Sequence, residues 1–208
     1  EWSKNACSNG PAAILAARLY QEFGNPEDKE WALRIYDWLK STLVNTNSGA
    51  VWDSIDSREG KINKDWIFTY NQGTYLGAAV ELHKILNEKS YLNDAALAAD
   101  YTMSSLVNNS ILKSEGDGDG GLFKGIFVRY FTQLIIQERL DEPVRRRYLQ
   151  FIKLNAETLW NEGTNKQNFL FSPNWRVKPG NTTGLTEQLS GCMLIESAAY
   201  LQKENYID

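Results

Sequence analysis

Apolar residues recur about every three to four positions through most of this chain, which is the spacing of one face of an α-helix. Breaks that contain glycine and proline, and polar loops, separate these periodic stretches. The pattern predicts seven helices, near residues 10–23, 27–44, 74–87, 91–107, 123–138, 143–160 and 185–202. A short extended piece is expected at residues 50–53, but no stretch has the pattern of a larger sheet, so an all-α fold is predicted.

The expected helices are of two kinds that alternate along the chain. The helix at 10–23 carries small residues on most sides, whereas the helix at 27–44 is amphipathic, with charged residues on one face. The chain also repeats weakly, because Leu43-Val44-Asn45 and Leu106-Val107-Asn108 occupy matching positions of two successive units. Repeated helical hairpins bury a core only by stacking on their neighbours. We therefore predict one α/α toroid-like domain over residues 1–208, with small-residue helices inside and amphipathic helices outside.

Polar and aromatic segments precede the small-residue helices. Asn9 is expected to cap the helix at 10–23, with Pro11 in its first turn, and Gly73 is expected to turn the chain into the helix at 74–87. Because all these segments lead into inner helices, they should meet on one face of the domain, at the N-terminal helix ends. The segments are residues 4–9, 66–72, 117–124 and 175–188.

These segments supply the candidate substrate-binding residues. Tyr and Trp offer flat apolar faces with a polar edge, and Asn and Gln offer paired donors and acceptors, a combination that suits hydroxyl-rich sugar rings. An ordinary helix entry with buried aromatics would use the same residues, and this alternative stays open. The candidates are Asn5, Asn9, Trp66, Tyr70, Asn71, Gln72, Lys124, Arg129 and Trp175.

Composition and charge argue against two classes of partner. The net charge of −4 disfavours nucleic acid, because phosphate binding needs a basic face. The one basic run, Arg145-Arg146-Arg147, is expected on a solvated helix face. No apolar run approaches the roughly 20 residues of a membrane span. The aromatic share of 12%, with seven Trp, fits either a carbohydrate site or a densely packed helical core.

No metal or cofactor is expected. Cys7 and Cys192 set no disulfide framework, and although they could pair if the first and last helices meet, buried free thiols are the favoured interpretation. His83, the only histidine, is expected to pack inside a helix rather than join the cysteines in a zinc site. The acidic, glycine-rich run at 117–121 is similar to the start of a calcium loop, but no Glu follows at the required spacing, which favours a flexible loop.

Three segments of the chain form a recognisable combination. They are residues 4–13, Trp66 together with Thr-Tyr-Asn-Gln-Gly-Thr at 69–74, and Leu-Phe-Lys-Gly-Ile-Phe-Val-Arg-Tyr at 122–130. In these segments the chain resembles glycoside hydrolase family 76, the endo-α-1,6-mannanases. The resemblance covers most of the chain. It implies an (α/α)6 toroid, a secreted, periplasmic or cell-surface setting, and retaining hydrolysis of α-1,6-linked mannose backbones.

The chain departs from this family at the catalytic residues. Family members use two adjacent aspartates, one as nucleophile and one as acid/base, whereas this sequence contains no Asp-Asp. Its adjacent acids, Glu27-Asp28 and Asp141-Glu142, open outer helices, where they favour the helix dipole. The catalytic residues are therefore unassigned, and the other carboxylates expected near the helix ends are Asp65, Asp117, Asp119 and Glu187.

Seven helices are also fewer than an (α/α)6 toroid requires. The chain is therefore expected to be the C-terminal part of the fold, lacking N-terminal helices, with Glu1 as a cut boundary. Such a part would expose apolar flanks of its inner helices and would either associate with itself or be covered by more chain.

Three functions remain open at this stage. The first is a glycoside hydrolase acting on α-1,6-mannan, with its catalytic acids outside these residues. The second is a non-catalytic glycan-binding or scaffold protein that kept the cleft and lost the acids. The third is an unrelated α/α repeat that binds protein partners, which a bare apolar groove in place of aromatic and polar segments would favour.

Overall fold

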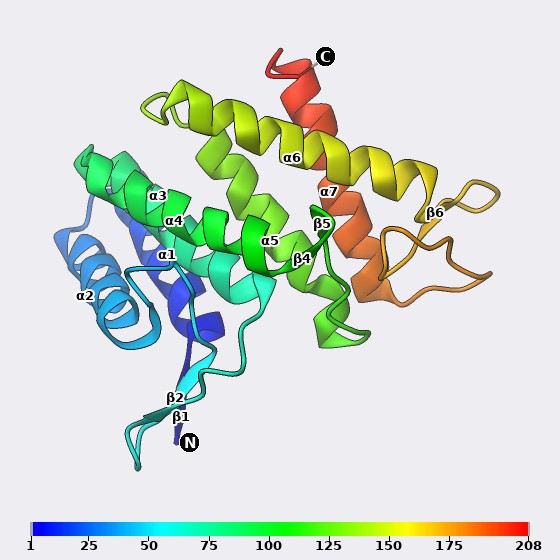
Figure 1. Cartoon of the computed structure of the whole chain (residues 1–208). Helices are drawn as coiled ribbons and strands as arrows, with labels where there is room; N and C mark the ends of the chain where they lie inside the picture. Colours follow the sequence, from blue (N-terminus) through cyan, green and yellow to red (C-terminus); the bar gives the residue numbers. More distant parts are fainter. Residues whose placement is uncertain (1, 208) are drawn as a thin grey trace.

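The computed structural model describes residues 2–207, and this part of the chain contains seven helices. Figure 1 shows their order in space. The all-α class and the number of helices are as predicted. The helices are α1 (Ala6–Phe23), α2 (Pro26–Leu43), α3 (Thr69–Leu86), α4 (Lys89–Ser105), α5 (Asp119–Ile135), α6 (Glu142–Asn161) and α7 (Leu185–Lys203).

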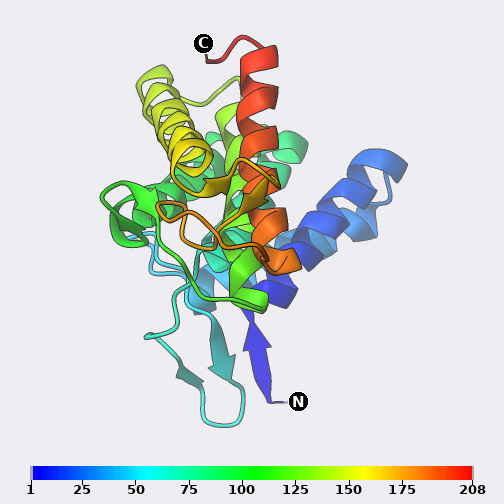
Figure 2. The same cartoon turned by 90° about the vertical axis from the view of Figure 1, so that its right-hand side faces the viewer.

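The helices form an inner row and an outer layer. Helices α1, α3, α5 and α7 pack side by side, and α2, α4 and α6 lie outside them (Figures 1 and 2). Gly73 explains how closely the row packs, because a Cβ atom there would lie 2.6 Å from the Cα of Phe127 on α5. Every residue of α3 from Thr69 to His83 is buried. The predicted alternation of inside and outside helices is confirmed.

Buried tyrosines join the outer helices to one another. Tyr36 of α2 donates a hydrogen bond to Asp94 of α4 at 2.6 Å, and Tyr148 of α6 donates to Asp100, also of α4, at 2.8 Å. Burial is the largest cause of the raised pKa of both phenols, followed by Tyr75 and Asp94 for Tyr36 and by Asp100 for Tyr148. α4 thus receives a hydroxyl from each side, which ties the three outer helices together.

The loops at one end of the inner row form short antiparallel strands. β1 (Ser3–Asn5), β2 (Ser54–Asp56) and β3 (Lys61–Ile62) make the largest sheet in the described residues, with three strands. The other two pairs are β4 (Val107–Asn108) with β5 (Ile111–Leu112), and β6 (Thr164–Asn165) with β7 (Leu170–Phe171). The extended piece expected at residues 50–53 is present only as a bridge between Val51 and Val44.

Three helices, α1, α3 and α5, start four or five residues earlier than predicted. α1 begins at Ala6, with Asn5 as its cap accepting from the Ser8 N–H at 3.0 Å, so the assignment of Asn9 as the cap was wrong and Pro11 lies within the helix. α3 begins at Thr69, so Gly73 is inside the helix and makes no turn. α5 likewise begins at Asp119 rather than 123. The start of α3 has no local signal, because its cap comes from a distant loop.

Several smaller predictions can be compared with the structure. Cys7 and Cys192 are both unpaired, as favoured, but Cys7 is exposed rather than buried because it faces outward from the first turn of α1. His83 is buried in α3, with Nδ1 2.9 Å from the Glu88 carbonyl oxygen, as expected. Arg145 is not merely solvated, since its guanidinium donates to the carbonyl of Ile135 at the end of α5 and to that of Gln137, just after the helix, at 2.9 Å.

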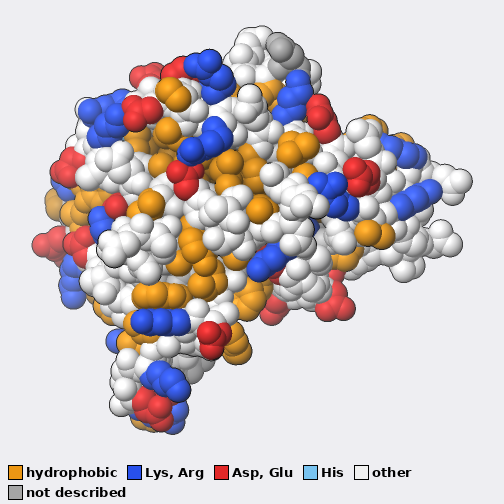
Figure 3. Space-filling view, in the orientation of Figure 1, with side chains coloured by type: hydrophobic (Ala, Val, Ile, Leu, Met, Phe, Trp, Pro, Cys, Tyr) orange, Lys and Arg blue, Asp and Glu red, His pale blue; other side chains and the backbone are white. Residues whose placement is uncertain are grey.

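Within residues 2–207 no helix is long and apolar enough to cross a bilayer. The same residues contain no group of three His, Cys, Asp or Glu side chains that could hold a metal ion. Basic and acidic side chains are interspersed on the face shown in Figure 3, with no continuous basic surface on that face.

Candidate functional site

The inner helices all start at the same end of the row, and we call this end the rim. It consists of the N-terminal ends of α1, α3, α5 and α7 with the loops that precede them (Figure 1). The lead-in segments were predicted to share such a face, and the start of every inner helix is found there. Backbone N–H groups at helix N-terminal ends favour carboxylates and other hydrogen-bond acceptors. Acceptor groups are therefore expected to bind at the rim.

A buried polar group lies at the start of α3. Tyr70 donates its hydroxyl hydrogen to the Asp53 carboxylate, and Asn71 donates to the same oxygen at 3.3 Å. The Oδ1 atom of Asn71 is buried and has no hydrogen-bond partner among the described residues. Burial, and then Asp53, raise the pKa of the Tyr70 phenol, so it stays protonated. An unpaired buried acceptor is costly, which makes it a place where a ligand hydroxyl or an ordered water can bind.

Aromatic side chains cover this polar group. The ring centroids of Tyr70 and Phe123 are 4.1 Å apart, and those of Phe68 and Tyr70 are 5.9 Å apart with nearly parallel planes. Trp66 extends the cluster outward, 6.5 Å from Phe68, and is 55% exposed. The rim therefore offers a flat exposed indole beside buried hydrogen-bonding groups, the combination that recognises sugar rings.

Glu115 is a rim residue that the sequence did not reveal. Its carboxylate accepts from the Thr69 N–H at 2.8 Å and from the Thr69 hydroxyl, so it caps α3. Burial raises its pKa, although the bonds from Thr69 act in the opposite direction. Asp53 was missed for the same reason. Both acids come from loops far from their partners in sequence, and no local pattern marks them.

Lys124 and Trp175 meet in a buried contact between α5 and the loop before α7. The ammonium of Lys124 donates to the Pro173 carbonyl at 2.6 Å and lies 4.1 Å from the centroid of the Trp175 ring. Lys124 is 1% exposed and Trp175 is fully buried. Both candidates therefore hold this loop against α5 and present no surface to a sugar. Burial lowers the pKa of Lys124 to about 7, and the Glu115 carboxylate acts in the opposite direction.

This pKa predicts a pH dependence of stability. From pH 7 up to the ordinary lysine value of 10.5, the unfolded chain keeps a proton that folded Lys124 has lost. The free energy of unfolding should therefore rise with pH, by at most about 1.4 kcal/mol per unit. Urea unfolding at pH 7, 8 and 9 measures this slope, and Lys124→Met should remove it.

Lys178→Met is the matched control, because Lys178 is an exposed lysine in the same loop. It should keep the slope of the unmodified chain. The buried tyrosines titrate above this pH range and do not interfere, because their pKa values are raised. An unchanged slope in Lys124→Met would show that another group causes the pH dependence.

Gln72 uses its side-chain amide to hold the loop that precedes α3. Its amide accepts from the Val51 N–H at 3.0 Å and donates to the Val51 carbonyl at 2.9 Å, and the side chain is fully buried. Gln188 on α7 holds the loop after α6 in the same way, with bonds to the Phe171 N–H at 2.9 Å and the Phe169 carbonyl at 3.1 Å. Gln72 and Gln188 are both the fourth residue of their inner helix, so this clamp recurs.

The remaining candidates are separated. Asn5 and Asn9 lie at the rim in the first turn of α1. The side-chain amide of Asn9 donates to the backbone carbonyl of Asn5 at 2.8 Å. Arg129 is exposed further along α5, with its guanidinium 5.9 Å from the Tyr130 ring. It lies on a different side of the helix from Lys124, because five residues turn a helix well past one full turn. The structure thus brings Trp66, Tyr70 and Asn71 together and leaves Arg129 apart.

Two of the expected rim carboxylates share one hollow. Asp117 and Glu187 line a cavity of about 500 Å³ between the starts of α5 and α7. Glu187 is buried there because Gly121 and Gly184 leave room for its carboxylate. Asp65 lines another hollow, beside the β1–β2–β3 sheet. These acids come from separate elements, and none forms an adjacent pair.

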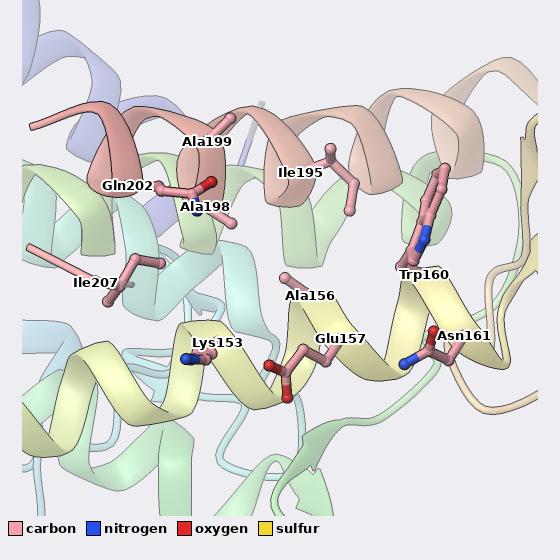
Figure 4. Close-up of a pocket in the computed structure, with 10 residues that line it drawn as sticks. All are labelled: Lys153, Ala156, Glu157, Trp160, Asn161, Ile195, Ala198, Ala199, Gln202 and Ile207. Atoms are coloured by element: carbon pink, nitrogen blue, oxygen red, sulfur yellow. The ribbon is translucent and has the colours of Figure 1, made fainter. Parts of the chain in front are cut away.

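A groove between α6 and α7 lies outside the rim (Figure 4). Its volume is about 390 Å³, and most of its lining is apolar. Trp160 stands at one end of it, and Glu157 is its only carboxylate in the described chain. One carboxylate cannot perform two-acid hydrolysis, so the groove is not a candidate active site.

Known proteins share both the sequence and the fold. The sequence profile of glycosyl hydrolase family 76 matches residues 2–207. The mannan endo-1,6-alpha-mannosidase DCW1 of Saccharomyces cerevisiae is 34% identical over 166 residues, which cover 74% of this chain and 35% of that protein. DCW1 of Eremothecium gossypii is 22% identical over 96% of this chain and 47% of its own length. The chain thus spans about half or less of these curated relatives.

A solved structure supports the same assignment. The GH76A alpha-1,6-mannanase from Salegentibacter sp. HEL1_6 superposes with a TM-score of 0.92 and 51% identity, over 96% of this chain and 60% of that one. An inactive variant of that mannanase, with two consecutive aspartates replaced by alanine, is known in complex with alpha-1,6-mannotetraose. The profile match over nearly the whole chain, together with the shared fold, shows that this chain belongs to glycosyl hydrolase family 76.

Proposed function

We propose that this chain forms the substrate-binding side of a glycosidase that acts on α-1,6-linked mannan. The observation that carries the proposal is the rim, where exposed Trp66 adjoins buried Tyr70, Asn71 and Asp53. The 51% identical relative is an alpha-1,6-mannanase, and its inactive variant binds alpha-1,6-mannotetraose, which supports this choice of polymer.

Each rim residue would have a different role in binding the sugar chain. Trp66 would stack on the apolar face of one mannose ring. The unpaired Oδ1 atom of Asn71 would accept a hydrogen bond from a sugar hydroxyl or from a water bound to it. Asp53 and Tyr70 would act as positioning residues, because their hydrogen bonds fix the orientation of the Asn71 amide.

The catalytic acids would come from elsewhere in the protein. Retaining hydrolysis needs two carboxylates about 5–5.5 Å apart, and this chain has no two consecutive aspartates. The inactive mannanase variant lacks such a pair, which supports a pair of this kind as the catalytic acids. We therefore place the acids outside residues 1–208 and propose that these residues form the C-terminal part of the family domain. The resemblance supports a secreted, periplasmic or cell-surface protein.

A second candidate is a non-catalytic glycan-binding or scaffold protein. The lack of consecutive aspartates in this chain favours it as well. The encoding gene separates the two, since an Asp-Asp segment ahead of Glu1 would support the enzyme and its absence would support the binding protein.

The binding role of the rim predicts the effect of Trp66→Ala. Loss of the exposed indole should raise the Kd for α-1,6-mannotetraose about tenfold, as expected for an exposed aromatic anchor. Isothermal titration calorimetry of the purified chain measures this change.

Trp31→Ala is the matched control. Trp31 is 52% exposed on outer helix α2, with the Arg34 guanidinium 4.7 Å from its ring. Because it is remote from the rim, its removal should leave the Kd unchanged. Equal affinity of Trp66→Ala and the unmodified chain would remove the rim from the binding site.

A further inference from the structure

The loops that follow α2 and α6 contain the same turn. After α2, the Asn45 carbonyl accepts from the N–H of Gly49 at 2.8 Å, and after α6 the Asn165 carbonyl accepts from the N–H of Phe169 at 2.7 Å. Gln72 and Gln188 clamp these two loops from equivalent positions of their inner helices. Gly49 and Phe169 are therefore equivalent residues in two copies of one structural unit.

The two copies carry very different residues at this position, glycine after α2 and phenylalanine after α6. Gly49 has a φ of +84°, which glycine adopts freely, and a Cβ atom there would lie 2.2 Å from the Leu97 carbonyl oxygen. Phe169 has a φ of +56°, which is unusual for a bulky side chain, and its ring is 58% exposed. The turn itself does not need phenylalanine, because glycine serves the same turn after α2. A strained backbone that presents an exposed aromatic ring points to a use for that ring.

Phe169 has an aromatic partner on the same surface. Trp160, in the last turn of α6, is 43% exposed, and its ring lies 6.5 Å from that of Phe169 with an angle of 14° between the planes. The ammonium of Lys166 lies 3.1 Å from the centroid of the Trp160 ring. We call Trp160, Lys166 and Phe169 the platform. Exposed Asn161, Gln167 and Asn168 adjoin the platform residues in sequence and carry hydrogen-bonding amides.

We propose that the platform is a second carbohydrate-binding site, which takes pyranose units of a neutral polysaccharide outside the rim. The stacked, exposed pair of rings offers aromatic surface on which the apolar C–H face of a sugar unit can pack, and Lys166 and the amides next to it in sequence supply donors for hydroxyl groups. The identity of the polymer, α-1,6-mannan, rests on the proposed function. A second contact on one polymer raises the local concentration of chain at the rim without changing the rim itself.

The test is affinity electrophoresis of the purified chain in native gels that contain α-1,6-mannan. Phe169→Gly is the informative variant. It places at this position the same residue as Gly49 in the loop after α2, and it removes the aromatic ring. It should keep or raise the midpoint temperature of unfolding and raise the apparent Kd for mannan about fivefold. Trp160→Ala should weaken binding to a similar extent, whereas Trp31→Ala, which removes an indole that is somewhat more exposed, should not.

Retardation of both platform variants equal to that of the unmodified chain would overturn the proposal. So would an equal loss in Trp31→Ala, which would indicate unspecific contact with exposed tryptophans, or Phe169-dependent binding to phosphatidylcholine vesicles in place of mannan. Trp66→Ala separates this proposal from the previous one. Loss in that variant alone would refute the platform and keep the rim, and loss in the platform variants alone would do the reverse.

Discussion

The purified 208-residue chain is expected to leave unbranched α-1,6-mannan intact. Retaining hydrolysis needs one carboxylate to attack and a second to donate a proton, about 5–5.5 Å apart. The chain has no adjacent aspartates, and two of its rim acids, Asp53 and Glu115, are already engaged in structural hydrogen bonds. Asp53 holds Tyr70 and Asn71, and Glu115 caps α3. Reducing-end release should stay below about 1 s⁻¹, under the usual range of enzyme turnover.

Asp117 and Glu187 are the two predicted rim carboxylates that line the same cavity. If the chain itself did hydrolyse mannan, this pair would be the first candidate for its catalytic acids. Turnover above about 1 s⁻¹ that Glu187→Gln abolishes and Asp65→Asn leaves intact would place the catalytic acids within this chain. A known α-1,6-mannanase on the same substrate serves as the positive control.

Replacing Gly73 by valine should cause a large loss of stability, because α3 and α5 pack closely at this residue. A Cβ atom at this position would lie 2.6 Å from the Phe127 Cα and 3.0 Å from its N. Both are backbone atoms, so no change of rotamer can relieve the overlap and α3 must move away from α5. We expect the free energy of unfolding to fall by about 4 kcal/mol, which lowers the midpoint temperature by about 10 °C.

Gly180→Val is the control for the change from glycine to valine. Gly180 is exposed, and no atom lies within 4 Å of a Cβ built there. Its substitution should change the free energy of unfolding by less than about 0.5 kcal/mol. If both variants unfold at the same temperature in differential scanning calorimetry, the close contact between α3 and α5 does not limit stability.

The site could be predicted only in part. Segment order placed the polar lead-ins at one end of the row, and Trp66, Tyr70 and Asn71 do lie together there. The direction in which each side chain points was not predictable. The side-chain amide of Gln72 could in principle bind a ligand, but in the structure it is hydrogen-bonded to the Val51 backbone. Lys124 is drawn inward by the Pro173 carbonyl and the Trp175 ring. These partners come from distant loops, so no local pattern reveals them.

The sequence by itself determined the seven helices, their alternation between inside and outside, and the family. Each depends on local periodicity or on contiguous motifs, which a chain carries whatever its partners are. Tertiary structure decided where α3 begins, because the Glu115 carboxylate caps it from the loop before α5. It also decided that Gly73 is a helix contact rather than a turn, because the approach of the Phe127 backbone is visible only once α3 and α5 have packed. The equivalence of Gly49 and Phe169 also depends on tertiary structure. The two residues occupy the same position of the same type of turn, in two loops whose sequences differ.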